Sequence, residues 1–98
     1  MSIKIHIPTP LRRFTGEAAE VEVEGTTVGE AMRDLTARFP ALERHLYADD
    51  GALRSFVNLF LNDDDVRHLE REKTPVNQGD TLSIIPSIAG GRAAGGGA

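Results

Sequence analysis

Apolar and polar residues alternate with a period of two in two stretches near the start of the chain. Residues 3–7 carry isoleucine at every second position and are followed by two prolines, while residues 19–24 set valines against glutamates. This alternation predicts two strands with one buried face each, and proline ends the first because it cannot donate to a ladder. The short connection, with apolar anchors at Leu11 and Phe14, favours an antiparallel hairpin.

The clearest helix signal follows the second strand. Thr27 is a predicted N-cap, and Glu30 stands three residues later, as in a capping box that satisfies two free backbone N–H groups reciprocally. A single apolar stripe then recurs at helical spacing and comprises Val28, Ala31, Met32, Leu35 and Phe39. Pro40 ends this helix, because the residue before a proline is pushed out of the helical region. A shorter helical turn is predicted over residues 42–46.

The second half of the chain reads as strands and turns. Residues 55–61 are almost continuously apolar, which predicts a central strand that is covered on both faces or lies near the helix. An acidic turn at 62–65 precedes a short edge strand or bridge at 66–69, and another short element is expected at 74–76. Residues 81–86 form the last predicted strand, which ends at a proline.

Composition limits the class of protein. The chain has 98 residues, a net charge of −4 and no cysteine. A chain of this size builds one modest core, and its acidic balance argues against nucleic-acid binding. We also expect no membrane segment or signal peptide, and a cytoplasmic location, because no apolar run is long enough. The lack of cysteine excludes thiolate catalysis and disulfides, so any sulfur that the protein handles is carried elsewhere.

The end of the chain differs in composition from the rest. From Ala89 to Ala98 it contains only glycine, alanine and one arginine. Such a segment buries too little apolar surface to offset the entropy of ordering it. We therefore predict a domain over residues 1–89 and a flexible tail over 90–98.

Four stretches, taken together, resemble the MoaD/ThiS family, which includes the small subunit of molybdopterin synthase and the sulfur carrier of the thiamine pathway. They are IKIHIPTPLRRFTG, TVGEAMRDLTARFP, FVNLFLNDDDVR and GDTLSIIPSIAGG, and they occur in the family's order. The most specific is the last, in which a strand and Pro86 lead to Ala89-Gly90-Gly91. Within the family, the first and third look most similar to the carrier used for cysteine synthesis in actinobacteria.

The resemblance implies a fold that the order of elements alone does not choose. It is an α+β β-grasp, or ubiquitin-like, fold with a mixed sheet of four to five strands crossed by one main helix. It also implies a protein that is not an enzyme. Such a carrier binds no cofactor, and its activating enzyme uses Mg-ATP.

The family's chemistry would act on the C-terminal carboxylate of Gly91. A ubiquitin-activating-type (E1-like) adenylating and sulfurtransferase enzyme would form an acyl-adenylate there, and a sulfur donor would displace AMP to leave a thiocarboxylate. The sulfur acceptor would be a synthase of the cysteine synthase type, holding an activated serine derivative, or the large subunit of molybdopterin synthase. In the cysteine branch, a metalloprotease would then release the product.

The resemblance also implies which parts of the chain meet these partners. Ala89, Gly90 and Gly91 would thread into a narrow channel, because glycine lacks a Cβ and passes constrictions. The outer sheet face forms the partner interface in such carriers, and strict alternation groups three residues of the central strand on one face. The candidate docking residues are Val57, Leu59, Leu61, Pro86 and Ile88, and the sequence leaves open whether the first three face a partner or face the helix as core.

One feature departs from the family pattern. Mature members end at the diglycine, whereas residues 92–98 follow it here. While they remain, Gly91 has a peptide carbonyl that cannot be adenylated. We expect a protease to cut the bond between Gly91 and Arg92. The alternatives are an extension without a role, or a protein that is no longer a carrier or uses Ala98.

Other candidate sites have simpler explanations. Residues 63–65 lack the glycine and glutamate spacing of a calcium loop, and the histidines lack metal-ligand spacing, so no metal site is predicted. Three alternating glutamates, Glu20, Glu22 and Glu24, fit a solvated strand face. Arg12 and Arg13 are surface residues that could contact a partner.

Two alternative functions remain open. One is a ubiquitin-like modifier that joins Gly91 to lysine, and the other is a synthase subunit with its tail permanently inserted in a partner.

Overall fold

A computed structural model describes residues 2–86 of the chain. Five strands form one sheet, and their bounds are β1 Ser2–His6, β2 Glu20–Glu24, β3 Val57–Leu61, β4 Asp64–Asp65 and β5 Thr81–Pro86. Two α-helices, α1 Val28–Arg38 and α2 Glu43–Leu46, and four short 3₁₀ helices complete the described part. The 3₁₀ helices are η1 Thr9–Phe14, η2 Pro40–Leu42, η3 Val66–His68 and η4 Arg71–Lys73.

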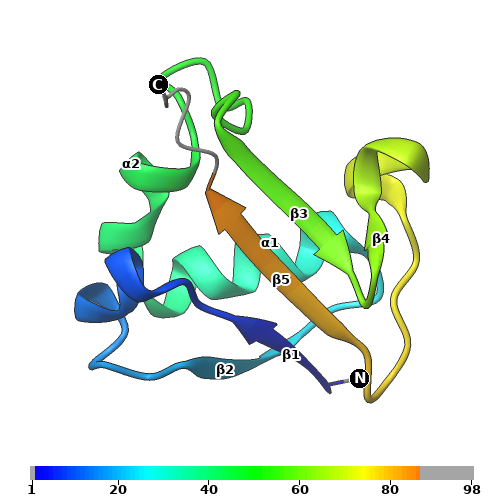
Figure 1. The fold of residues 1–98 in the computed structure, drawn as a ribbon, viewed down its shortest axis with the longest axis horizontal. Helices are drawn as coiled ribbons and strands as arrows, with labels where there is room; N and C mark the ends of the chain where they lie inside the picture. Colours follow the sequence, from blue (N-terminus) through cyan, green and yellow to red (C-terminus); the bar gives the residue numbers. More distant parts are fainter. Residues whose placement is uncertain (1, 87–98) are drawn as a thin grey trace.

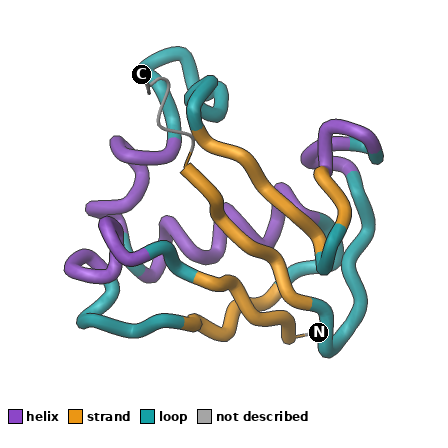
Figure 2. Tube along the Cα trace, viewed as in Figure 1, coloured by secondary structure: helices purple, strands orange, loops and turns teal. Residues whose placement is uncertain are grey.

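The sheet is mixed and its strand order is β2-β1-β5-β3-β4. The first and last strands pair in parallel, while the other neighbours are antiparallel. Helix α1 crosses one face of the sheet, and the opposite face carries no helix in the described residues (Figures 1 and 2). This arrangement confirms the predicted β-grasp fold. Because β5 lies in the middle, the last strand of the chain is held by neighbours on both sides.

The predicted hairpin is confirmed by the register of its two strands. Ile3 stands opposite Val23 and Ile5 opposite Val21, so the apolar residues of both strands share a face. Their connection contains η1 and a tight turn. Leu11 and Phe14 in this connection pack against the core, as their apolar character predicted.

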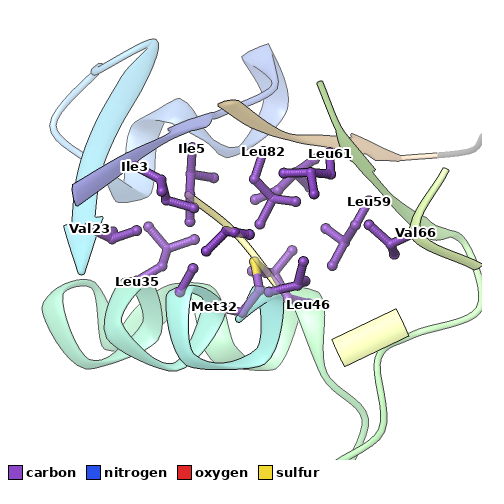
Figure 3. Packing of buried hydrophobic residues seen from close by; sticks show 14 of the residues in the cluster. Ile3, Ile5, Val23, Met32, Leu35, Leu46, Leu59, Leu61, Val66 and Leu82 are labelled. Atoms are coloured by element: carbon purple, nitrogen blue, oxygen red, sulfur yellow. The ribbon is translucent and has the colours of Figure 1, made fainter. Parts of the chain in front are cut away.

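The core lies between α1 and the inner face of the sheet (Figure 3). Every strand except the two-residue β4 contributes to it, and Leu35 and Met32 from α1 are fully buried. Its other large members are Ile3, Ile5, Ile7, Val23, Val28, Leu42, Leu46, Leu59, Leu82 and Ile84. Burial of this apolar surface is the main favourable contribution to folding.

The start of α1 is capped almost as predicted. The backbone N–H of Glu30 donates to the Thr27 hydroxyl oxygen at 3.2 Å. The Glu30 carboxylate does not return to the Thr27 N–H, however. It accepts from the backbone N–H and the hydroxyl of Thr26, each at 2.8 Å. The capping box thus differs from the predicted one in its second hydrogen bond, whose donor is Thr26 and not Thr27.

Two predicted elements differ in the structure. Residues 66–69 were expected to form an edge strand or bridge, but η3 occupies this segment, because the Asp65 carboxylate accepts from the Arg67 N–H and caps a helical turn. The edge strand is instead Asp64–Asp65. The element expected at 74–76 is a single bridge between Thr27 and Pro75.

Three further predictions concern the rest of the chain. The turn at 42–46 is confirmed as α2. No helix among residues 2–86 is long and apolar enough to cross a membrane. The boundary predicted at residue 89, and the tail of residues 90–98, lie outside the described residues.

Candidate functional site

The point where β5 ends determines where the C-terminal segment leaves the domain. Pro86 is the last described residue and pairs with Val57, the first residue of β3. Proline has no N–H to continue the ladder, so the regular hydrogen bonding of β5 stops at this position. The expected tail residues Ile88, Ala89, Gly90, Gly91 and Arg92 lie outside the described residues.

The structure corrects the predicted docking residues of β3. The exposed fractions of Val57, Leu59 and Leu61 are only 6%, 2% and 9%, so these residues belong to the core and not to the exposed outer face of the sheet. Strict alternation did place them on one face, but that face is the inner one, where α1 covers the sheet. Pro86 is half-buried at the end of β5 and remains near the surface.

The outward-facing residues of β3 and β5 form the accessible surface instead. Asn58 stands opposite Ile85, and Phe60 stands opposite Ser83, so these four side chains share the outer face. Ile85 is 45% exposed, which is unusual for a residue of its size in a central strand. We define the outer patch as Asn58, Phe60, Ser83 and Ile85. Sequence reasoning missed it, although the polar Asn58 within an apolar run was the signal.

Acidic residues extend along one edge of the same face. Glu20, Glu22 and Glu24 are exposed on β2, as a solvated strand face predicts. Strand β1, which carries Lys4 and His6 between its buried isoleucines, lies between this row and β5. The outer face therefore combines an apolar centre with an acidic margin.

A cleft of about 430 Å³ opens beside β3, away from the outer patch. Its apolar wall comes from Val57, Leu59 and Val66, which lie at the margin of the core. Its remaining residues include three arginines and one acid, and they are Ala52, Leu53, Arg54, Ser55, Arg67, Arg71 and Glu72. No sequence pattern predicted this cleft, because its walls come from segments that meet only in the folded chain.

The charged groups with altered pKa values have structural partners. The Arg67 guanidinium, at 2.7 Å from Asp65, lowers the pKa of that carboxyl to about 2. Burial, and secondarily the nearby Glu72 carboxylate, raises the pKa of Tyr47 to about 12. Among residues 2–86, no group of three or more metal-ligating side chains comes together.

The other residues considered from sequence serve the fold. His45 stacks on Phe14 with ring centroids 4.4 Å apart, and the Arg13 guanidinium lies 5.1 Å from the centre of the same ring. The Arg12 Nε donates to the Ile7 carbonyl at 2.9 Å. In the acidic turn, Asp65 is held by its ion pair with Arg67. The ring contact joins η1 to α2, the Arg12 hydrogen bond ties η1 to the residue after β1, and the Asp65–Arg67 pair joins β4 to η3.

Comparison with known proteins places the chain among sulfur carriers. The ThiS family matches residues 5–91. The sulfur carrier protein CysO of Mycobacterium tuberculosis is 37% identical over 93 residues, which covers 93% of this chain and all of the relative. In the crystal structure of the Amycolatopsis orientalis BexX/CysO complex, one chain is 38% identical and superposes with a TM-score of 0.82, covering 91% of this chain and 99% of that one.

A relative with another printed role is also similar. The small archaeal modifier protein 3 of Haloferax volcanii is 35% identical over 68 residues, which covers 69% of this chain and 73% of the relative. The family match covers residues 5–91, which include most of the sheet, helix α1 and the diglycine. The fold, the central placement of β5 and the diglycine thus agree with the comparisons, and the chain belongs to the ThiS family of ubiquitin-like sulfur carriers.

Proposed function

We propose that this chain carries sulfur as a thiocarboxylate on Gly91 and donates it in cysteine synthesis, after residues 92–98 have been removed. One observation supports this proposal above the others. The family match ends at Gly91, and the relative with 37% identity over its whole length is a sulfur carrier. The terminal carbonyl of Gly91 is then the reacting group, and the partners supply the catalytic machinery in the cytoplasm.

The proposed chemistry has two steps at one carbon. In the first, a carboxylate oxygen of Gly91 attacks the α-phosphorus of Mg-ATP in an E1-like enzyme, which forms the acyl-adenylate and releases pyrophosphate. In the second, hydrosulfide attacks the acyl carbon, the carbon–sulfur bond forms, and the bond to AMP breaks. A carboxylate oxygen is a poor leaving group, whereas AMP is a good one, so adenylation makes the replacement of oxygen by sulfur feasible.

The fold supports presentation of that carbon to a partner. Gly91 follows Pro86 by five residues, which span up to about 17 Å when extended. β5 pairs with β1 as far as Ser83 and with β3 as far as Pro86, so this segment starts from a strand that is anchored in the sheet. An anchored base and a narrow glycine-ended segment suit entry into a neighbour's active site.

Maturation follows from the same chemistry. A peptide bond to Arg92 leaves Gly91 without a carboxylate, so adenylation requires a cut after Gly91. A protease that removes residues 92–98 would therefore switch the carrier on. We propose a metalloprotease for this step, and for release of the carrier–cysteine adduct after sulfur transfer to an activated serine in a cysteine synthase-type enzyme.

The outer patch supports docking of those partners. It offers apolar surface from the exposed Ile85, close to the end of β5 where the C-terminal segment leaves, and from the half-buried Phe60. An apolar centre with a polar margin is typical of protein interfaces. Docking on this patch would place the segment that follows Pro86 at the partner's surface.

A mass measurement tests the proposal. A chain ending at Gly91 and the chain ending at Ala98 are each incubated with the adenylating enzyme, Mg-ATP and sulfide. We expect a gain of about 16 Da only in the shorter chain, because sulfur replaces one carboxylate oxygen. No gain in the shorter chain, or an equal gain in the longer one, would contradict the proposal.

The similarity to the archaeal modifier favours one second candidate. A modifier would transfer its Gly91 acyl group to a lysine and would carry no sulfur to a small acceptor. The same incubation with cell extract distinguishes the two functions, since a modifier yields larger conjugates that resist reduction. Pterin and thiamine acceptors, as in the other branches of the family, are distinguished by the synthase that consumes the thiocarboxylate.

A further inference from the structure

The arginine-lined cleft lies next to the point where the C-terminal segment leaves the sheet. Val57 contributes to the apolar wall of the cleft and is also the partner of Pro86. Two further wall residues, Arg54 and Ser55, come shortly before β3 in the chain. The chain after Pro86 therefore starts beside Val57, a residue of the cleft wall.

Two arginines of the cleft have charge to offer an anion. Arg67 is neutralised by its ion pair with Asp65. Arg54 uses its Nε to donate to the Arg44 carbonyl at 2.9 Å, which fixes the side chain while its remaining N–H groups stay available. Arg71 makes no ion pair or hydrogen bond through its side chain with the described residues, and its backbone adopts a left-handed φ of 54°.

The acid of the cleft does not cancel this charge. Glu72 is exposed, and the ion pairs among the described residues do not include it. Arg54 and Arg71 therefore line the cleft without an acidic partner among the described residues.

The residues that follow Pro86 suit this cleft in length and composition. After Ser87 and Ile88 come only alanine and glycine up to Gly91, so one apolar side chain and a slender backbone are offered. Five residues reach about 17 Å, which is enough to cross a cleft of this volume and end in a carboxylate at the arginines. Arginine is the side chain best suited to hold a carboxylate.

We propose that the mature C-terminus, residues 87–91, docks in this cleft of its own domain, with the Gly91 carboxylate or thiocarboxylate held by Arg54 and Arg71. This inference rests on the proposed function, since it needs the cut that creates the Gly91 carboxylate. Docking in cis benefits from an effective concentration of about millimolar, so weak contacts suffice. The docked terminus is kept from water until a partner on the outer patch withdraws it.

The uncut chain does not dock in this way. Gly91 then bears no charge, and Arg92 brings a cation toward two arginines. Like charges brought together in a cleft repel each other, and this repulsion is screened as salt is added. Cleavage after Gly91 therefore changes the sign of the charge at this point, which couples maturation to docking.

Methyl and amide NMR on two forms of the protein tests this inference. The first form ends at Gly91 and the second at Ala98, and both contain the whole described domain. We expect shift differences at the methyl groups of Val57, Leu59 and Val66, with slower motion of the Gly91 amide in the shorter form. In the shorter form, Arg71→Ala should remove most of these differences.

Two controls make the outcome decisive. Lys73→Ala removes one cation from the same 3₁₀ helix but leaves the cleft lining intact, so the shift differences should remain. Arg71→Lys keeps a positive charge at this position and should retain part of the shift differences. Identical cleft methyl shifts in both forms, equal loss in Lys73→Ala, or shifts that grow with protein concentration would overturn docking in cis.

The same samples separate this inference from the proposed function. Thiocarboxylation of the shorter form is measured by mass in parallel. A chain that docks but never gains sulfur sinks the sulfur-carrier proposal and leaves the docking result standing. A chain that gains sulfur while its cleft methyl shifts match those of the longer form overturns docking alone.

Discussion

Val57 at the start of β3 stands directly opposite Pro86 at the end of β5. This pairing brings the core, the arginine-lined cleft and the departure of the C-terminal segment to one corner of the domain. The side chain of Val57 is buried, while the partner proline ends the ladder. Gly91, the proposed reacting residue, therefore follows the anchored end of β5 by five residues.

Neighbouring isoleucines on β5 test the assignment of the two sheet faces. Ile84 is 1% exposed and stands opposite Leu59, whereas Ile85 is 45% exposed and stands opposite Asn58. We expect Ile84→Thr to lower the free energy of unfolding by about 2–4 kcal/mol, because it removes core volume and buries a hydroxyl. Ile85→Thr should change it by less than about 0.5 kcal/mol. Denaturant unfolding measures both.

Binding of the adenylating enzyme should depend on Ile85, the residue whose substitution has the smaller effect on stability. Ile85→Thr keeps the fold but removes apolar surface from the outer patch, so affinity for the adenylating enzyme should fall. If both variants lost similar stability, or if Ile85→Thr bound the enzyme like the wild type, the outer patch would not be the docking surface.

The N-cap of α1 provides a second test. Thr27 accepts a hydrogen bond from the Glu30 N–H, so Thr27→Ala should cost about 1 kcal/mol of stability. Thr36→Ala is a matched control, because the Thr36 hydroxyl donates to the Arg33 carbonyl within the helix and alanine is the better helix former. Thermal unfolding should show a loss for the first variant and no loss for the second.

Acid should weaken the attachment of α1 to the strand before it. Hydrogen bonds from the Thr26 backbone and hydroxyl lower the pKa of Glu30, and the bond from the Glu24 N–H lowers that of Asp34. Each carboxylate is more acidic in the folded state, so its contribution is full above its ordinary pKa of 4.5 or 3.8 and is lost as pH falls below it.

A double variant measures this contribution. Glu30→Gln with Asp34→Asn should flatten the fall in stability as the pH drops below the ordinary pKa values of 4.5 and 3.8, where these carboxyl groups bind protons in the unfolded chain before they do so in the folded one. Denaturant midpoints across this range give the slope. A slope as steep in the variant as in the wild type would show that other groups control the acid response.

Gly91→Ala separates tail function from folding. In a chain ending at residue 91, the added methyl group obstructs a narrow channel and displaces the reacting carbon. We expect the rate of thiocarboxylate formation to fall about 10- to 100-fold, since a displacement on the order of 1 Å has an effect of this size. Stability should stay within about 0.5 kcal/mol, as for substitutions that touch no core residue. Wild-type rates, or a large loss of stability, would contradict this account.

The sequence predicted most of the fold because its local signals agree with each other. The alternation at 3–7 and 19–24, the cap at Thr27 and the stripe through Leu35 all specify elements that the structure contains. The reciprocal bond of Glu30 was misplaced by one residue, because Thr26 offers both a backbone and a hydroxyl donor nearby.

Tertiary contacts explain what the sequence did not predict. A period of two groups Val57, Leu59 and Leu61 on one face, but only the position of α1 decides that this face is the inner one. The η3 turn at 66–68 depends on the Asp65 carboxylate meeting the Arg67 N–H. The diglycine, in contrast, was recognised through resemblance, because its meaning lies in partner chemistry and not in packing.

The central claim is that Gly91 becomes the working terminus of a sulfur carrier. The most direct test is the intact mass of the protein isolated from its native cells under non-oxidising conditions. The account predicts a chain that ends at Gly91, with a fraction heavier by about 16 Da that reverts on hydrolysis. A protein that keeps Ala98 while it supports sulfur transfer at full rate would contradict the claim.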